Sequence, residues 1–407
     1  MKKIYFAITI MLLAAIPTGV MALDLSNIRL NGFVSQGYLD SSKNNYLDLA
    51  SKDGTFQLNE AGITISAQAT DKLRIGFQLL SRDLGPEGNN NFVLDWGFAD
   101  YRINNALGAR AGKIKMPMGL YNEGRDSDML RDMVFLPQSI YKESWRSFMG
   151  AAQGASLYGN VDLGGLGDVE YQALLGEVNI DVSSVYLIQE GIIGGIEENG
   201  LVVNKLNFKC DNAFAASLVM NTALNGLRLG FSYLDVQGVF DGQLNSFGGT
   251  AFPAVLEPFT VEAELKDKYV LSAEYLHQYL SLRTEYMQAR NNIRINGHPV
   301  LGTNDMVVDT AEGYFVMATV PTFTDALKLS ALYDVYYSNK NHKGDTQTGE
   351  GYRKDIAIGL RYDVLNNWII KAEYHDIEGT APFLVNYNDD PLEKDWSYVV
   401  AKTTFLF

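Results

Sequence analysis

The sequence has little of the chemistry that builds haem, metal and disulfide sites. It contains one cysteine, Cys210, and four histidines among 407 residues. A single cysteine excludes a disulfide framework within the chain and a Cys-x-x-Cys-His haem motif. No two histidines have the spacing of metal ligands. We therefore expect no metal and no other cofactor, and we predict that Cys210 is an inert thiol in a loop.

Long apolar runs are also absent after the first residues, which argues against a helical membrane protein. Lys2 and Lys3 precede a short apolar run, residues 4–16, which Pro17 interrupts. This pattern is typical of a secretory signal peptide, which we place at residues 1–22, with an N-terminal membrane anchor as the alternative. The sequence therefore predicts export from the cytoplasm.

Basic residues are outnumbered, with 33 Lys and Arg against 48 Asp and Glu and a formal net charge of −15. Nucleic-acid binding requires clustered Lys and Arg, so we expect no nucleic-acid partner. The acidic excess mainly indicates that the exposed parts are soluble.

Alternation with a period of two residues dominates the rest of the chain. In residues 73–82, one face carries apolar side chains and the other carries Arg74, Gln78 and Arg82. A soluble β-sandwich also alternates. Here, however, formal charges lie within the strands, and the apolar face begins or ends in Tyr or Trp in strand after strand. These two features favour a membrane barrel with a wet interior and aromatic girdles.

The alternating segments predict sixteen strands joined alternately by short turns and long loops. We place them near residues 28–39, 55–69, 72–82, 92–103, 107–116, 150–161, 168–176, 213–222, 226–235, 267–276, 280–290, 311–320, 327–337, 353–363, 368–378 and 395–407. The predicted fold class is therefore all-β, an antiparallel transmembrane β-barrel over residues 23–407. Segments 201–209 and 260–266 could add two more strands, which would give eighteen.

The third long loop, residues 117–149, is unusually long and rich in charge. Loops of this length are usually functional or disordered. Its many apolar residues favour burial against the inside of the barrel wall. The stretch NEGRDSDMLRD, residues 122–132, carries six charges, which we predict to line a constriction of the pore: Glu123, Arg125, Asp126, Asp128, Arg131 and Asp132.

Other uses of these charges fit the sequence less well. A catalytic carboxylate pair needs one acid that stays protonated, whereas neighbouring arginines favour ionised carboxylates. Asp126, Asp128 and Asp132 could hold calcium, but the segment lacks the glycine and the terminal glutamate of an EF-hand loop. A barrel lipase needs a Ser–His arrangement, and His375 has no such motif around it. We therefore expect no enzyme activity.

Three segments give the chain a resemblance to a known family. RAGKIKMPMGLYNEGRDSDMLRDMVFLPQSIYKESWRSF, residues 110–148, resembles the region from strand 5 to loop 3 of Gram-negative outer-membrane porins. NTALNGLRLGFSYL, residues 221–234, resembles their strand 8–turn–strand 9 hairpin. WSYVVAKTTFLF, residues 396–407, alternates to a terminal phenylalanine, which resembles the assembly signal of outer-membrane barrels. The PEFGG-type motif of enteric porins is absent, so eyelet positions cannot be transferred one by one.

The resemblance implies a homotrimer in the outer membrane, in contact with lipid and lipopolysaccharide, that passes ions and small polar solutes by passive diffusion. Opposite charges across a narrow constriction create a transverse field that favours polar solutes. Five arginines are candidates for the wall opposite the loop: Arg74, Arg110, Arg228, Arg283 and Arg361. The alternative is that the charges only hold the loop in place through salt bridges and have no role in selectivity.

Two other functions remain open. The barrel could be a sheath for a partner such as a multihaem cytochrome, which would make it part of an electron conduit. It could also take up a specific solute. The acidic excess does not favour a basic ladder for anions, and we assign nearly every tyrosine to the lipid girdle, which leaves few aromatic side chains for a sugar path.

Overall fold

The structure is a computed structural model that describes most of the chain from residue 27 to residue 407. Residues 48–49, 86–87, 183–187, 189–192, 194, 198–201, 247–254, 297–306, 344–348, 383–387 and 389–390 are excluded. The predicted signal peptide, residues 1–22, lies outside the described residues. In the described part, no helix has the length and apolar character needed to cross a membrane.

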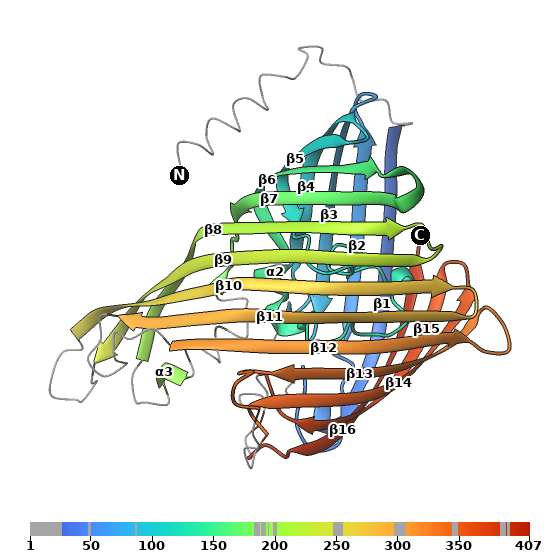
Figure 1. Cartoon of the computed structure of the whole chain (residues 1–407). Helices are drawn as coiled ribbons and strands as arrows, with labels where there is room; N and C mark the ends of the chain where they lie inside the picture. Colours follow the sequence, from blue (N-terminus) through green and yellow to red (C-terminus); the bar gives the residue numbers. More distant parts are fainter. Residues whose placement is uncertain are drawn as a thin grey trace.

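Sixteen antiparallel strands close into one barrel (Figure 1). Each strand pairs with its neighbours in sequence, and β1 closes the barrel by pairing with β16. The predicted barrel is thereby confirmed. The strands are β1 (Ile28–Ser41), β2 (Asn59–Gln68), β3 (Leu73–Asp83), β4 (Phe92–Asn104), β5 (Leu107–Lys115), β6 (Ala151–Asp162), β7 (Gly167–Glu177), β8 (Val202–Thr222), β9 (Leu227–Ser246), β10 (Val255–His277), β11 (Leu280–Asn296), β12 (Val307–Pro321), β13 (Leu327–Tyr337), β14 (Tyr352–Leu365), β15 (Trp368–Gly379) and β16 (Asp395–Leu406).

The two faces of the barrel have the polarity that the alternation predicts. On β15, Ile370 and Tyr374 are exposed on the outside, whereas Lys371 and Glu373 are buried on the inside. Apolar outer side chains suit contact with lipid, and the inner polar side chains need partners within the barrel.

Strands β8 to β11 are much longer than predicted and extend past the others at the long-loop end (Figure 1). Segments 201–209 and 260–266 are not additional strands, so eighteen strands is wrong. From residue 202 onward the first belongs to β8, and the second lies within β10. Strands of ~9–11 residues span a bilayer, so the 20 residues of β9 and 23 of β10 exceed the span.

The polarity of the two faces inverts along these long strands. In the N-terminal part of β9, Phe231 is exposed on the outside and Ser232 is buried on the inside. Further along, the buried inner side chains are Leu234, Val236 and Phe240. The wet interior of the barrel thus gives way to an apolar core where the strands leave the bilayer span. A prediction that assumes the same alternation along the whole strand therefore misses the extension.

β-Bulges accompany the inversion. The register shifts between Leu265 and Lys268 on β10 and between Cys210 and Asn212 on β8, and a bulge of one residue changes which side chains face inward. Cys210 lies in β8 and is buried. The prediction that it lies in a loop is therefore wrong.

The remaining helical pieces are short: η2 (Ser51–Asp53), η3 (Asp128–Leu130), η4 (Glu143–Trp145), α2 (Arg146–Met149), η5 (Gly164–Leu166) and α3 (Gly195–Glu197). Three of them, η3, η4 and α2, belong to the segment that joins β5 to β6. This segment, residues 116–150, lies inside the barrel (Figure 1) and is called the inner loop below.

Candidate functional site

The inner loop is held mainly by burial. All residues from 131 to 143 are buried. Met116, Met118, Ile140 and Tyr141 pack into the main apolar cluster of the barrel interior. The loop turns at Gly119, whose φ of +56° favours glycine and where a Cβ would collide with the Tyr141 hydroxyl. The inward-folded third loop predicted from its apolar residues is therefore present.

Strands on one side of the barrel also bind the loop through its backbone. Glu285 on β11 accepts a hydrogen bond from the Leu120 amide at 2.8 Å, and Ser232 on β9 accepts one from Gly119 at 2.8 Å. Asp334 on β13 accepts one from the Ser139 amide at 3.1 Å. Because buried amides need partners, these side chains fix the path of the loop.

Asp128 is at the centre of the first group of buried charges. Its carboxylate lies 3.3 Å from Lys371 Nζ and 2.9 Å from Lys402 Nζ, and it accepts a hydrogen bond from Thr404 at 2.6 Å. Arg131, three residues along, pairs with the same carboxylate. Asp128, which was predicted to line the pore, is therefore bound to β15 and β16, and Arg131 is bound to Asp128.

Asp132 is the centre of the second group. It pairs with Arg283 on β11, and Arg361 on β14 lies 3.9 Å away. Arg361 also donates to the backbone oxygens of Met129 and Arg131 at 2.9 and 2.8 Å. Two of the predicted wall arginines thus hold the loop in place.

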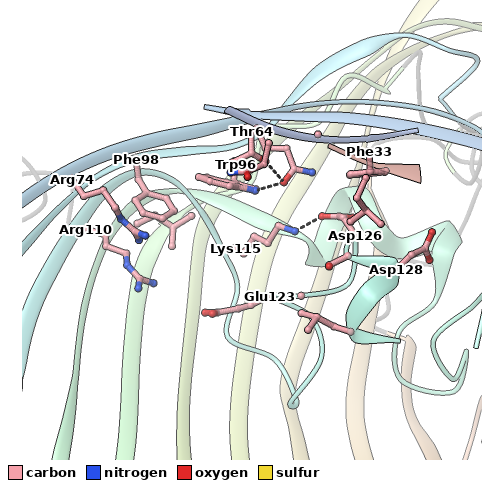
Figure 2. Close-up of a pocket in the computed structure, with 18 residues that line it drawn as sticks. Phe33, Thr64, Arg74, Trp96, Phe98, Arg110, Lys115, Glu123, Asp126 and Asp128 are labelled. Atoms are coloured by element: carbon pink, nitrogen blue, oxygen red, sulfur yellow. Dashed lines mark hydrogen bonds and ion pairs between the residues drawn. The ribbon is translucent and has the colours of Figure 1, made fainter. Parts of the chain in front are cut away.

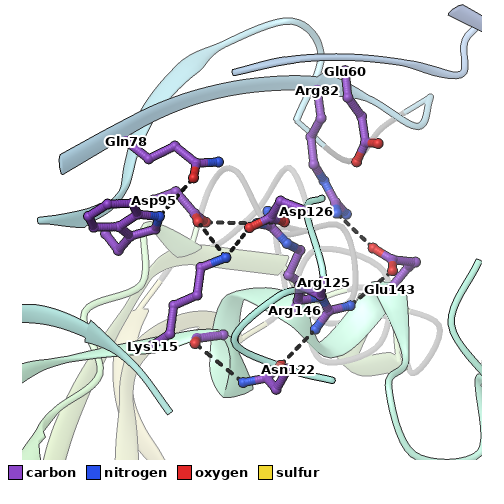
Figure 3. A network of polar contacts seen from close by, with 12 residues as sticks. Glu60, Gln78, Arg82, Asp95, Lys115, Asn122, Arg125, Asp126, Glu143 and Arg146 are labelled. Atoms are coloured by element: carbon purple, nitrogen blue, oxygen red, sulfur yellow. Dashed lines mark hydrogen bonds and ion pairs between the residues drawn. The ribbon is translucent and has the colours of Figure 1, made fainter. Parts of the chain in front are cut away.

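A third group lies where the loop leaves β5 (Figure 3). Asp126 pairs with Lys115 and with Arg146, which is 2.8 Å from Asp95 on β4. Beside it, Glu143 lies 2.9 Å from Arg125 and 2.8 Å from Arg82 on β3.

The electrostatics of the loop keep these acids ionised. Burial alone would raise the pKa of Glu143, but Arg125 and Arg82 lower it to about 2. In the same way, neighbouring cations outweigh burial and hold the pKa values of Asp126, Asp128 and Asp132 below their usual range. Buried ionised pairs of this kind are strongly destabilised when one partner is removed.

The three aspartates of the calcium alternative are not brought together around one position. Asp126, Asp128 and Asp132 each bind a different set of Lys and Arg side chains. Within the described part of the chain, no group of three His, Cys, Asp or Glu side chains is arranged to hold a metal ion. The structure therefore gives the calcium alternative no support.

Glu123 differs from the other five loop charges because it is exposed. It lines a cavity together with the buried Asp126 and Asp128. Its enclosure within the barrel raises the pKa of Glu123 above its usual range, although Arg110 and Lys115 act in the opposite direction. Of the six charges predicted for the constriction, Glu123 is therefore the one with a carboxylate available to solutes.

The cavity is about 470 Å³ in volume and lies between the inner loop and the first strands (Figure 2). Its wall from β3 to β5 is called the open wall below, and it presents Arg74, Gln78, Trp96, Phe98 and Arg110. The rest of the lining comes from Asn31, Gly32, Phe33, Thr64, Ile114, Lys115, Glu123, Gly124, Asp126, Ser127, Asp128, Leu130 and Leu406.

The five predicted wall arginines divide between two locations. Arg74 and Arg110 line the cavity, and both approach Asp100, at 3.1 and 3.6 Å. Arg228, Arg283 and Arg361 lie on the other side of the barrel, among the strands called the anchoring wall below, β9–β11 and β13–β16. There Arg228 pairs with Glu274 at 3.2 Å.

The sequence did not reveal the aromatic part of the open wall. A register shift opposite Gln78 and Leu79 leaves Asp95 unpaired in β4. This bulge lets both Asp95 and Trp96 face inward, which breaks the alternation of residues 92–103. Tyrosines are not confined to the lipid girdle either, because Tyr141 and Tyr398 are buried inside the barrel.

No protein family model and no curated protein sequence matches the chain. Solved structures do match it. Salmonella typhi OmpF in complex with daunomycin superimposes with a TM-score of 0.57 at 13% identity, over 95% of this chain and 100% of that chain. An anion-selective porin from Comamonas acidovorans gives 0.56 at 12% identity, over 93% and 99%.

The outer-membrane channel DcaP of Acinetobacter baumannii gives a TM-score of 0.53 at 11% identity, over 94% of this chain and 99% of that chain. At such identities the likeness concerns the fold. The chain therefore has the fold of the outer-membrane porins, a closed sixteen-stranded antiparallel barrel, as the sequence resemblance implied.

Proposed function

We propose that the protein is an outer-membrane porin that forms an aqueous channel for passive diffusion of ions and small polar solutes. The observation that carries this proposal is the cavity of about 470 Å³ beside the inner loop, which is lined by charges of both signs. A sixteen-stranded barrel is wide enough for an aqueous channel. The porins that share its fold support the same function.

In this proposal the constriction lies between Glu123 and the open wall, where Arg74 and Arg110 face the cavity. The other predicted constriction charges act indirectly, because Arg125, Asp126, Asp128, Arg131 and Asp132 are buried and fix the position of the inner loop beside that passage. Lipid and lipopolysaccharide would cover the apolar outer face. A homotrimer is the proposed assembly, because a trimeric form of Vibrio cholerae OmpT is among the structures with a similar fold.

Nothing in the described residues favours the sheath alternative. The inner loop occupies space in the lumen that a folded cytochrome would need, and its charges are satisfied by the barrel itself.

Planar-bilayer conductance of the refolded protein tests the proposal, with the reversal potential measured under a salt gradient. We expect stepwise conductance whose ion preference follows Glu123 and the open-wall arginines. Deletion of residues 122–132 should increase the conductance, because it removes the loop segment beside the cavity. Absence of conductance from a folded, heat-modifiable barrel would refute the channel function.

A further inference from the structure

The two ends of the Gln78 side-chain amide on β3 differ in their hydrogen bonding. Its Oε1 accepts hydrogen bonds from Trp96 Nε1 at 2.7 Å and from Thr64 Oγ1 at 3.5 Å. An indole nitrogen can only donate, so it fixes which end of the amide is the oxygen. Gln78 Nε2 has no hydrogen-bond partner in the described part of the protein, although Gln78 is more than nine-tenths buried. The cavity wall therefore contains an oriented donor without an acceptor.

Positive charge lies elsewhere on the same wall of the cavity. Arg74 and Arg110 share a single carboxylate, Asp100, which also accepts a hydrogen bond from the Tyr158 hydroxyl. The Arg110 Nε atom lies 3.6 Å from the Asp100 carboxylate, beyond hydrogen-bond distance, and the Arg74 side chain is 49% exposed. Two guanidinium groups share this one acid, and the exposed Arg74 suits an anion.

A flat apolar surface lies between these polar groups (Figure 2). The rings of Trp96 and Phe98 are neighbours, with centroids 5.3 Å apart and an angle of 31° between their planes. The Arg110 guanidinium lies over the Phe98 ring at 5.2 Å. Aromatic rings in this setting favour contact with another flat ring.

We propose that the open wall is a binding subsite for a small organic anion that carries a flat apolar group. This inference rests on the proposed function, because it names the class of solute that the channel would select. The anionic group takes the Gln78 amide, its ring lies against Trp96 and Phe98, and Arg74 and Arg110 attract the anion from the other end of the rings. The cavity of about 470 Å³ is within the usual size range of small-ligand sites, ~300–1,000 Å³.

Glu123 on the inner loop lies close to Arg110 and offsets part of its charge. It is the exposed acid of the inner loop. A single anionic group can use the exposed Arg74, whereas a second one would meet the Glu123 carboxylate beside Arg110 and be repelled. The subsite should therefore prefer monoanions over dianions.

Isothermal titration on the folded, detergent-solubilised protein tests the subsite. The probes are benzoate, acetate, benzylammonium and glucose, which separate the contributions of charge and ring. We expect benzoate to bind more tightly than the other three. Gln78→Glu keeps the acceptor for Trp96 but replaces the free donor by an anion, so it should weaken benzoate binding about tenfold or more.

Phe98→Leu provides a second variant that breaks no hydrogen bond, and it should reduce the advantage of benzoate over acetate. Arg228→Gln is the matched control, because it removes a lumen arginine outside the cavity and should leave benzoate binding unchanged. Heat-modifiable electrophoretic mobility confirms that each variant is folded.

Wild-type protein that binds glucose or benzylammonium as tightly as benzoate would overturn the subsite, as would a folded Gln78→Glu variant with unchanged benzoate affinity. Channel recordings separate this result from the proposed function. Conductance without benzoate binding would refute the subsite alone, whereas benzoate binding without conductance would support the subsite and refute the channel.

Discussion

Charged residues that face the cavity on the open wall have a different role from charged residues of the same kind on the anchoring wall. On the anchoring wall, the Arg361 and Lys371 side chains are 5% and 2% exposed, and both bind the inner loop. On the open wall, the Arg74 side chain is 49% exposed and lines the cavity. The comparison teaches that charge in a barrel interior has a structural role where the loop covers it and a channel role where the loop leaves it open.

The largest effect is expected on the anchoring wall. Asp128→Asn would remove the acid that Lys371 and Lys402 share, and removing one partner of a buried pair costs ~3–5 kcal/mol. We expect the free energy of unfolding in urea, followed by tryptophan fluorescence in detergent, to fall by about that amount. Asp71→Asn, at an exposed turn, is the control and should change it by less than ~0.5 kcal/mol. Equal effects of the two substitutions would contradict the anchoring role.

A second prediction compares two acids of the same loop. Glu123→Gln should lower the cation-to-anion permeability ratio by about twofold to fivefold. The substitution removes one charge from the lumen, and in water the Coulomb energy between that charge and a passing ion is only ~1 kcal/mol. Glu123→Gln should leave the free energy of unfolding unchanged. Asp126→Asn should lower the free energy of unfolding and leave the permeability ratio unchanged, since Asp126 is buried between Lys115 and Arg146. The reversal potential and the unfolding free energy of both variants check this, and a larger selectivity change in Asp126→Asn would contradict it.

The pH dependence should separate the same two groups. The pKa of Glu123 is raised from 4.5, so its charge and its contribution to cation preference should disappear as pH falls through a midpoint above 4.5. The pKa of Glu143 is lowered from 4.5 to about 2, so its stabilising effect is complete above 4.5 and is lost as pH falls from there to about 2. Reversal potentials and unfolding measured from pH 7 to pH 2 test this order. In the Glu123→Gln variant, the loss of cation preference at low pH should be absent.

Much of the fold follows from the sequence because alternation is a local property. The strand predicted at residues 327–337 is β13, and the strand predicted at 368–378 differs from β15 by one residue. The long parts of β8 and β10 were missed because polarity inverts beyond the bulges near Cys210 and Leu265. A single pattern of apolar outside and polar inside cannot follow a strand across that change.

The site was less predictable because its partners are distant in sequence. Asp128 and Glu123 look equivalent in the stretch NEGRDSDMLRD, but Asp128 meets Lys371, which is 243 residues further along. Nothing local shows which loop acid will find such a partner. The aromatic pair Trp96 and Phe98 was missed for a local reason, because the bulge at Asp95 disrupts the alternation of β4.

Cysteine accessibility tests the central claim most directly, which is that the passage runs along the open wall and not between the inner loop and the anchoring wall. Ser127 lines the cavity, whereas Ser139 is fully buried against β13. In a Cys210→Ser background, a charged thiol reagent applied during bilayer recording should reduce the current of Ser127→Cys within minutes and leave Ser139→Cys unaffected. Rapid modification of Ser139→Cys with no change in Ser127→Cys would contradict the claim.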